Sequence, residues 1–233
     1  MYRDLGRIRL KTGEEVNAGV VRGPDPEWHD ALTRFLAHKG QPWEWQVSLF
    51  LSEELAMSPR FYVAHRDGEL VSNVMTCESR GTGLLGHVYT KPDERRQGAM
   101  RALMDRQMED FRERQGEALL LGTGYDSPPF HLYHSFGFRP VEPGSGKMEY
   151  YTGTRAAFEE RWFADGEVEV APFDWGDWAP SAALFLSDGP EVVRCASLGI
   201  LGRALPEGPL TRYFREEAGR QAGAEEQLAP RAY

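Results

Sequence analysis

The most informative segment of the chain is TKPDERRQGAM, residues 90–100, which joins a predicted strand to a long predicted helix. Pro92 ends the strand, because proline cannot donate the backbone hydrogen bond that a sheet requires. Gly98 opens the helix at a turn whose free backbone N–H groups and positive helix-dipole end suit an anion. Positive charge is added there by Arg95, Arg96 and Arg101. The segment therefore predicts a turn that binds phosphate or diphosphate.

The surrounding pattern predicts a mixed α/β fold. Before the turn, the expected elements are two short strands within residues 7–21, helices at 25–40 and 42–55, and strands at 60–65, 70–78 and 84–90. After it, apolar residues recur every three or four positions over 96–114, which is typical of an amphipathic helix. A strand at 118–122, a helix at 128–136 and strands from 138 and at 148–152 follow. This order favours a largely antiparallel sheet with flanking helices.

A second motif, LYHSFGF, occupies residues 132–138, about 35 residues after the turn. With the first motif it makes the sequence resemble the GNAT superfamily of acetyl-coenzyme A-dependent N-acyltransferases. The order Arg95 to Gly98 matches the family signature Arg/Gln-x-x-Gly-x-Gly/Ala, and residues 132–138 match its Leu-Tyr-x-x-x-Gly-Phe helix end. Met100 departs from the pattern, which has Gly or Ala there, and Thr90 stands where valine is usual.

The resemblance covers about residues 16–152 and implies the acyl-CoA N-acyltransferase fold, with a central parallel pair of strands that splay apart. The pantetheine arm of acetyl-coenzyme A is expected in that opening. The resemblance places the cofactor against Val88, Tyr89, Thr90, Arg95, Arg96, Gln97, Gly98, Ala99, Met100, Arg101, Asp126 and Tyr133. Asp126 takes the place of a cofactor-contacting asparagine, and it is equally suited to cap the helix that follows.

By the same resemblance, Tyr133 is the general acid that protonates the departing thiolate. A phenol with a pKa near 10 is protonated at neutral pH, so it can donate this proton. The alternative is a core tyrosine with a satisfied hydroxyl. Cys77 has no histidine close in sequence to activate it, so direct transfer without an acyl-enzyme is expected.

The acceptor amine must lose a proton before it can attack, so a base is expected. His87 is the first candidate, although it could instead pack against the sheet. The other candidates are Tyr89, Glu78, Asp126 and His131. The acceptor pocket is expected from Trp43, Glu44 and Trp45, where the tryptophans are equally suited to the core and Glu44 favours a cationic acceptor.

Composition narrows the class of protein. The 233 residues carry a net charge of −9 and are 41% hydrophobic, as in ordinary globular proteins. No apolar run is long enough to span a membrane, and the charged first residues do not resemble a secretory signal, so a cytoplasmic location is expected. The acidic balance disfavours nucleic acid. Cys77 and Cys195 lack zinc-ligand spacing and are expected to be reduced, buried thiols, and no metal is expected.

The resemblance implies that the chain divides at about residue 152 into a GNAT domain, residues 1–152, and an extension, residues 153–233. The extension from residue 155 holds 14 acidic residues, eight arginines and no lysine. Its aromatic content predicts packing rather than disorder, with fraying after about residue 218. A strand, a turn and a helix start are expected at 167–178, and helices at 179–187 and 210–220. The extension is interpreted as a partial second GNAT-like unit, a lid or a dimerisation segment of a homodimer.

The sequence thus predicts an N-acetyltransferase that acts on a primary amine of a small molecule or peptide, with acetyl-coenzyme A as cofactor. One alternative is a non-catalytic acyl-coenzyme A sensor with the same fold. Another is a nucleotide site at the phosphate-binding turn, which would bind coenzyme A and adenosine nucleotides alike.

Overall fold

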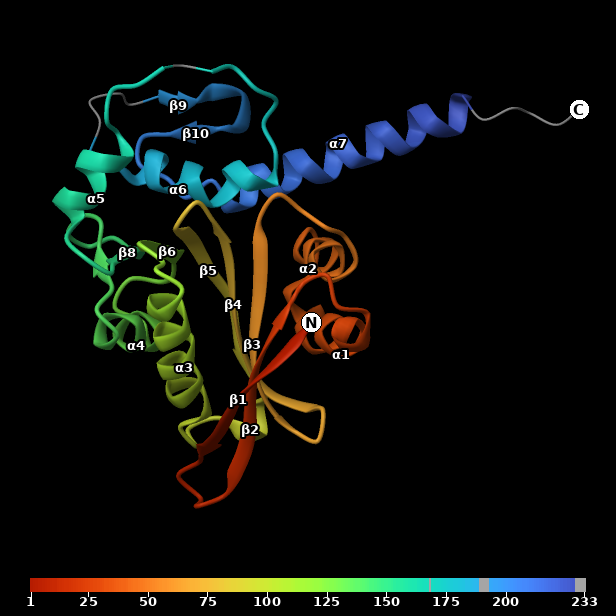
Figure 1. The fold of residues 1–233 in the computed structure, drawn as a ribbon, viewed down its shortest axis with the longest axis vertical. Coiled ribbons are helices and arrows are strands. Elements are labelled where there is room, and N and C mark those ends of the chain that lie inside the picture. The colour runs from red at the N-terminus through yellow and green to blue at the C-terminus, as the bar shows by residue number, and fades with distance from the viewer. Residues whose placement is uncertain (168, 189–192, 229–233) are drawn as a thin grey trace, which may run out of the picture.

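The computed structural model describes residues 1–167, 169–188 and 193–228. Its centre is an eight-stranded sheet in the order β1-β2-β3-β4-β5-β6-β8-β7 (Figure 1). Only β5 and β6 are parallel neighbours, so the predicted mixed, largely antiparallel sheet is confirmed. The strands are β1 Tyr2–Arg9, β2 Glu15–Arg22, β3 Ser58–Arg66, β4 Glu69–Ser79, β5 Thr82–Thr90, β6 Ala118–Gly122, β7 Arg139–Pro140 and β8 Lys147–Tyr151.

Helices cover both faces of the sheet. One face carries α3 Ala99–Glu113 and α4 Pro128–Ser135, and the other carries α1 Pro26–Leu36 and α2 Trp43–Ser52 (Figure 1). Strand residues alternate between the two cores. Phe61 and Val63 join the core under α1 and α2, whereas Tyr62 and Ala64 join the core under α3 and α4. The sheet therefore separates two hydrophobic cores, one under α1 and α2 and one under α3 and α4.

Local sequence explains the helix boundaries. Asp25 caps α1 by accepting from the backbone N–H groups of Glu27 and Trp28, and Ser127 caps α4 by accepting from Phe130. Gly98 caps α3 in the left-handed conformation at φ 90°, which glycine adopts without a side-chain clash. The predicted helices and strands up to residue 152 all form, with shifted ends. The strand expected from Phe138 is reduced to the two residues of β7.

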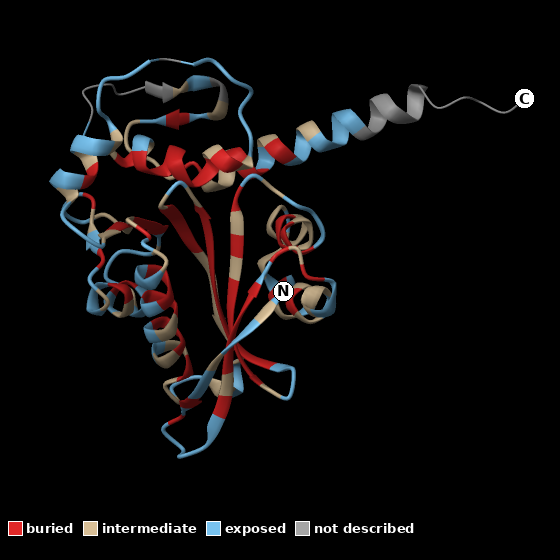
Figure 2. Cartoon of the chain, viewed as in Figure 1, coloured by how far each residue is buried: buried red, intermediate tan, exposed pale blue. Residues whose placement is uncertain are grey.

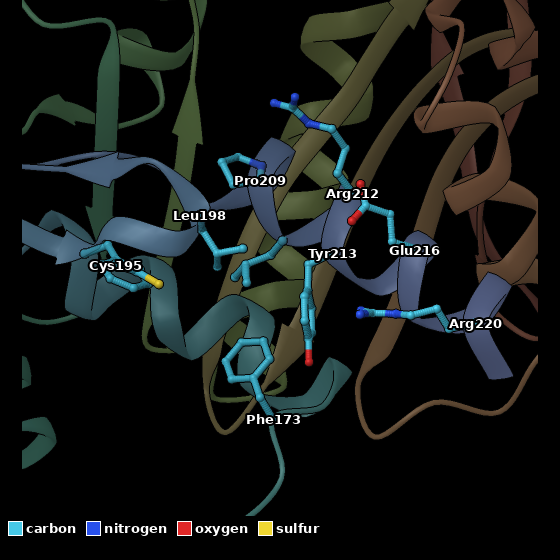
Figure 3. Close-up of a pocket in the computed structure, with 10 residues that line it drawn as sticks. Phe173, Cys195, Leu198, Pro209, Arg212, Tyr213, Glu216 and Arg220 are labelled. Carbon is cyan, nitrogen blue, oxygen red and sulfur yellow. The ribbon is translucent and has the colours of Figure 1, made fainter.

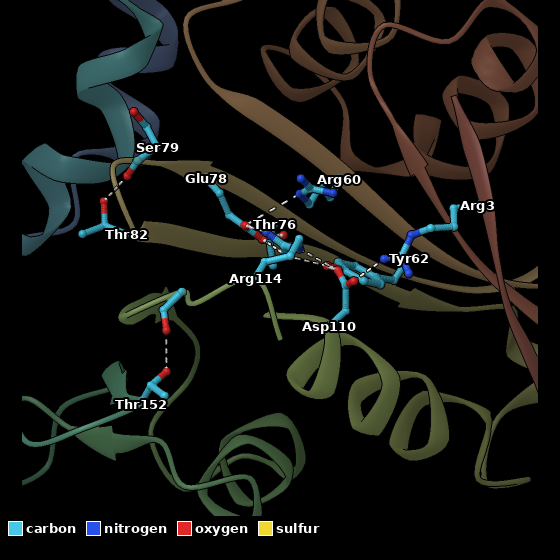
Figure 4. A network of polar contacts seen from close by, with 11 residues as sticks. Arg3, Arg60, Tyr62, Thr76, Glu78, Ser79, Thr82, Asp110, Arg114 and Thr152 are labelled. Carbon is cyan, nitrogen blue, oxygen red and sulfur yellow. Dashed lines mark hydrogen bonds and ion pairs between the residues drawn. The ribbon is translucent and has the colours of Figure 1, made fainter. Parts of the chain in front are cut away.

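A buried polar cluster holds the C-terminal end of α3 to the sheet (Figure 4). The Asp110 carboxylate accepts from Tyr62 at 2.5 Å and from Arg114 at 2.9 Å, and it also pairs with Arg3. Arg114 also donates to the Glu78 carboxylate, which accepts a second hydrogen bond from the Thr76 hydroxyl at 2.5 Å. Burial raises the pKa of Asp110, but the hydrogen bonds from Tyr62 and Arg114 outweigh it and hold the pKa below its usual value. Glu78, a candidate base from sequence, is instead part of this cluster.

The extension packs on the same face as α1 and α2. It consists of α5 Arg155–Trp162, η3 Trp175–Asp177, α6 Trp178–Leu186, β9 Val193–Cys195, η4 Ala196–Leu198, β10 Ile200–Leu201 and α7 Glu207–Leu228. Trp178 in α6 and Leu210 and Phe214 in α7 are buried in the core under α1 and α2. Figure 2 shows buried residues along α6 and the first turns of α7, where they meet the sheet.

One expectation for the extension, the strand beginning at residue 167, is wrong. The described residues between 164 and 174 form no strand. A helix not expected from the sequence, α5, forms just after the sheet ends, capped by Thr154. The helix expected at 210–220 is longer in both directions, and residues 229–233 of the segment expected to fray lie outside the described residues.

One further prediction concerns the two cysteines. Cys77 is a buried free thiol, as expected, whereas Cys195 is only partly buried. In the part of the chain that the structure describes, no helix is long and apolar enough to cross a membrane, and no cluster of three or more His, Cys, Asp or Glu side chains has the arrangement of a metal site.

Candidate active site

The central opening of the sheet lies between β5 and β6. The two strands pair only from Thr82 to Leu84 and from Ala118 to Leu120, after which β5 continues alone on that side. A β-bulge interrupts β5 between Gly86 and Tyr89, where His87 adopts a positive φ of 46°. The bulge turns the end of β5 away from β6 and leaves the edge at residues 85–90 without a strand partner.

A pocket of about 470 Å³ follows this free edge to the start of α3. It is lined by Lys11, Val88, Tyr89, Thr90, Glu94, Arg95, Arg96, Gly98, Ala99, Met100, Arg101, Pro128, Pro129 and Leu132. The structure thus brings together two of the predicted parts, residues 88–90 and the turn at 95–101, and adds the N-terminal half of α4. Met100 lines the pocket and leaves it open.

The turn supplies positive charge at one end of the pocket. Arg95 donates to the Thr90 carbonyl at 3.2 Å, and Arg101 donates to the Ser135 hydroxyl at 2.9 Å. Among the described residues, none forms a hydrogen bond or ion pair with the side chains of Arg96 or Lys11. These two cations and the first N–H groups of α3 are therefore available to an anion.

Tyr133 is buried in the core under α3 and α4, where its ring packs against Phe138. No described residue hydrogen-bonds its hydroxyl. Burial, and then the negative charge of Glu207, raise the pKa of Tyr133 above its usual value, so the phenol is protonated at neutral pH. Leu132, its neighbour in α4, lines the pocket.

His87 lies on the other side of the opening. Its Nε2 lies 3.0 Å from Oε1 of Gln46, and the edge of the Trp43 ring packs against it with 5.7 Å between ring centroids. Gln46 in turn donates to the Thr211 hydroxyl at 2.8 Å. Burial, with the nearby charges of Lys39 and His38, lowers the pKa of His87 to about 3. The imidazole is therefore neutral, and it is a weak proton acceptor at neutral pH.

Several predicted site residues lie outside the pocket. Gln97 turns back to the Asp93 carbonyl at 3.3 Å, and Asp126 is an exposed residue whose carboxylate pairs with His131 at 3.0 Å. Trp45 packs against Trp175 of the extension, which is the core role that was weighed for it.

Glu44 accepts from the exposed Gln41. Of the predicted acceptor residues, only Trp43 adjoins the opening, through its contact with His87. Sequence analysis missed Lys11, Glu94, Pro128, Pro129 and Leu132 of the pocket. Lys11 lies in the turn between β1 and β2. Its backbone N–H donates to the Gln97 carbonyl at 2.8 Å, and no local pattern reveals this contact across 86 residues.

A larger cavity of about 700 Å³ lies within the extension, away from both motifs (Figure 3). It is lined by Phe173, Phe185, Cys195, Leu198, Pro209, Leu210, Arg212, Tyr213, Glu216 and Arg220. None of these residues belongs to the pocket along β5, so the two cavities are separate.

Comparisons with known proteins agree with the motifs. The profile of the family described as Acetyltransferase (GNAT) domain matches residues 58–140, from the start of β3 to β7. No curated protein sequence matches this chain.

Similar solved structures include the GNAT domain of S. lividans PAT, at 12% identity, covering 63% of this chain and 96% of that one with a TM-score of 0.49. The ribosomal-protein-S18-alanine N-acetyltransferase from Escherichia coli is 18% identical, over 58% of this chain and 95% of that one, with a TM-score of 0.43. PaiA N-acetyltransferase from Thermoplasma acidophilum, in complex with coenzyme A, is 12% identical over 57% and 98% of the two chains, with a TM-score of 0.41. Residues 58–140 of this chain thus match a GNAT acetyltransferase domain, and the acyltransferases of this family take acetyl-coenzyme A as acyl donor.

Proposed function

We propose that this protein transfers the acetyl group of acetyl-coenzyme A to a primary amine of a small molecule or peptide. The observation that carries the proposal is one continuous pocket that joins the cationic turn at 95–101 to the free edge of β5 at 88–90 and to α4. An elongated donor with a diphosphate at one end and a thioester at the other matches this arrangement of charge and shape.

The residues of the pocket fit such a donor. A diphosphate needs N–H donors and positive charge, which the start of α3, Arg96 and Lys11 supply. The amides of the pantetheine arm need backbone partners, and β5 has a free edge at residues 88–90 because β6 diverges from it. The adjoining Pro129 and Leu132 offer apolar contact to the methylene groups of the arm.

Tyr133 is the proposed general acid. Its protonated hydroxyl has no partner among the described residues, and it belongs to the helix that borders the pocket. When the carbon–sulfur bond breaks, this hydroxyl donates a proton to the thiolate. Cys77 is not proposed as a nucleophile, because burial raises the pKa of its thiol and keeps it protonated. The amine therefore attacks the thioester directly.

Calorimetric titration with acetyl-coenzyme A, coenzyme A and ATP tests the donor site. Binding of both coenzyme A forms, and not of ATP, is the expected result. Thiol release from acetyl-coenzyme A in the presence of primary amines then tests transfer. Equal binding of ATP would favour the nucleotide site, and coenzyme A binding without thiol release for any amine would favour the sensor.

A further inference from the structure

The first turn of α7 lies over the opening between β5 and β6. A Cβ atom placed on Gly86 of β5 would lie 3.4 Å from Oε1 of Glu207, and one placed on Gly122 of β6 would lie 2.8 Å from Cδ1 of Leu205. Gly86 and Gly122 each stand two residues beyond the last pair of the parallel ladder, Leu84 with Leu120. Residues 205–207 therefore bridge the two strands at the point where they separate.

This segment is on the face opposite the donor pocket. Leu84 and Leu120 belong to the core under α1, α2, α6 and α7, and alternation along each strand places Gly86 and Gly122 on that same face. Tyr133 belongs to the core on the other face. Glu207 and Tyr133 thus approach the opening from opposite sides of the sheet.

The Glu207 carboxylate has the burial and the raised pKa of a group that can exchange protons at neutral pH. It is half-buried, and no described residue forms a hydrogen bond or ion pair with its carboxylate. Burial raises its pKa to about 7. The titratable groups that face it are the Cys77 thiol of β4, the Tyr133 phenol of α4 and, next to Gly86, the His87 imidazole of β5, and all three are neutral at pH 7.

A chain of hydrogen bonds fixes this turn of α7. Thr211 follows Glu207 by four residues and so lies on the same side of the helix. Its buried hydroxyl accepts from Gln46 of α2 at 2.8 Å, and Gln46 also bonds to His87 at 3.0 Å. The helix that carries Glu207 is thereby tied to both α2 and the bulge of β5.

We infer that Glu207, from the extension and outside the matched family domain, is the general base that deprotonates the acceptor amine. The inference rests on the proposed function. The bridge at residues 205–207 places its carboxylate on the acceptor side of the opening, across the sheet from the general acid. Its negative charge selects an acceptor that arrives as an alkylammonium ion.

The proton and bond changes balance without a further reactant. The ammonium gives one proton to the Glu207 carboxylate, and the nitrogen lone pair bonds to the acetyl carbon. The carbon–sulfur bond breaks, the sulfur takes a proton from Tyr133, and the second nitrogen proton replaces the one that Tyr133 donated. Glu207 releases its proton to water. The products are one amide, one thiol and one proton.

The test compares two amine probes in Glu207→Gln, with Glu216→Gln as the control, because Glu216 is exposed two turns further along α7. n-Butylamine is protonated at pH 7.5 and needs a base, whereas hydroxylamine is already unprotonated. We expect Glu207→Gln to lower kcat/KM for n-butylamine by about 100-fold. The rate with hydroxylamine should change by less than about fivefold, and coenzyme A affinity should stay at the wild-type value. Glu216→Gln should behave as the wild type.

Other results would overturn the inference. If Glu207→Gln binds the donor and acetylates n-butylamine at the wild-type rate, Glu207 is not the base, and the proposed function is unaffected. If the wild-type protein neither binds coenzyme A nor releases thiol with either probe, both the proposed function and the inference about Glu207 are wrong. Should Glu207→Gln not fold, Glu207→Asp replaces it. Reduced n-butylamine turnover that still rises with pH through about 7 supports the inference, and a flat profile opposes it.

Discussion

At the scale of single residues, burial gives the proposed acid and the proposed base the protonation states that they need. The acid must hold its proton at neutral pH, and the base must be able to accept one and release it. Burial disfavours the charged form of any acid. It therefore keeps the Tyr133 phenol protonated for donation, and it brings the pKa of Glu207 to about 7, where a carboxylate both accepts and releases protons. His87, the base expected from the sequence, is shifted in the direction that makes it a weaker acceptor.

Tyr133→Phe should retain the fold and the donor site, because only a hydroxyl without a described partner is removed. We expect kcat for n-butylamine to fall by about 100-fold with unchanged coenzyme A affinity. Steady-state kinetics and calorimetry measure the two quantities. Full activity in Tyr133→Phe would show that the thiolate leaves without this proton.

Glu207 should also affect stability in a pH-dependent way. Its pKa in the folded protein is raised, so folding favours the protonated form, and stability is lost as pH rises from the unfolded value through about 7. Glu207→Gln removes this loss. Its Tm should exceed that of the wild type at pH 8, and the difference should shrink at pH 5. Thermal unfolding at the two pH values measures this, and a difference independent of pH would contradict it.

At the scale of elements, the two ends of α3 have different tasks. The N-terminal end presents cations and N–H groups to the donor pocket, and the C-terminal end is held by the buried cluster around Asp110. Each end can be tested separately, because Arg96 and Asp110 share no partner.

Arg96→Ala should weaken coenzyme A binding by about tenfold, the loss of one charge-assisted contact with phosphate. Affinity should also become less sensitive to salt, because one screened attraction is gone. Calorimetry at two salt concentrations measures both effects. Arg106→Ala, which removes a surface pair with Glu109 in the same helix, serves as the control and should match the wild type.

Asp110→Asn should destabilise the protein by about 3 kcal/mol at pH 7, because it breaks a buried ion pair and leaves Arg114 and Tyr62 imperfectly satisfied. The pKa of Asp110 is lowered in the folded protein, so its stabilisation is present at neutral pH and is lost as pH falls through that lowered value. Urea unfolding at pH 7 and at low pH should show the gap between the variant and the wild type closing in acid.

At the scale of the whole molecule, sequence patterns were most informative where structure is local. The motif at residues 90–100 and the periodicity of 96–114 contain the turn, the helix and most of the donor pocket. The role of Trp45, the pairing of Asp110 with Arg3 and the approach of Glu207 to Gly86 depend on contacts across more than 100 residues. Such contacts depend on how elements far apart in the sequence pack together, and no short-range pattern records them.

Coupling between distant segments can be measured with Thr211→Val. This variant removes the acceptor that Gln46 uses and so loosens the first turns of α7 from β5. We expect kcat/KM for n-butylamine to fall by about tenfold, with no further loss when Glu207→Gln is already present, since a positioning residue acts through the group it positions. Additive losses in this double-mutant cycle would separate Thr211 from Glu207.

The two glycines at the opening have a consequence for evolution. A side chain at Gly86 or Gly122 would contact or displace residues 205–207, so the bridge and the two glycines constrain each other. Related chains that keep this extension should retain glycine or another small residue at both positions, whereas chains that lack it are free to accept larger residues there. Covariation between the glycine pair and the extension would then identify, from sequences alone, the members that draw a residue of their active centre from beyond the GNAT domain.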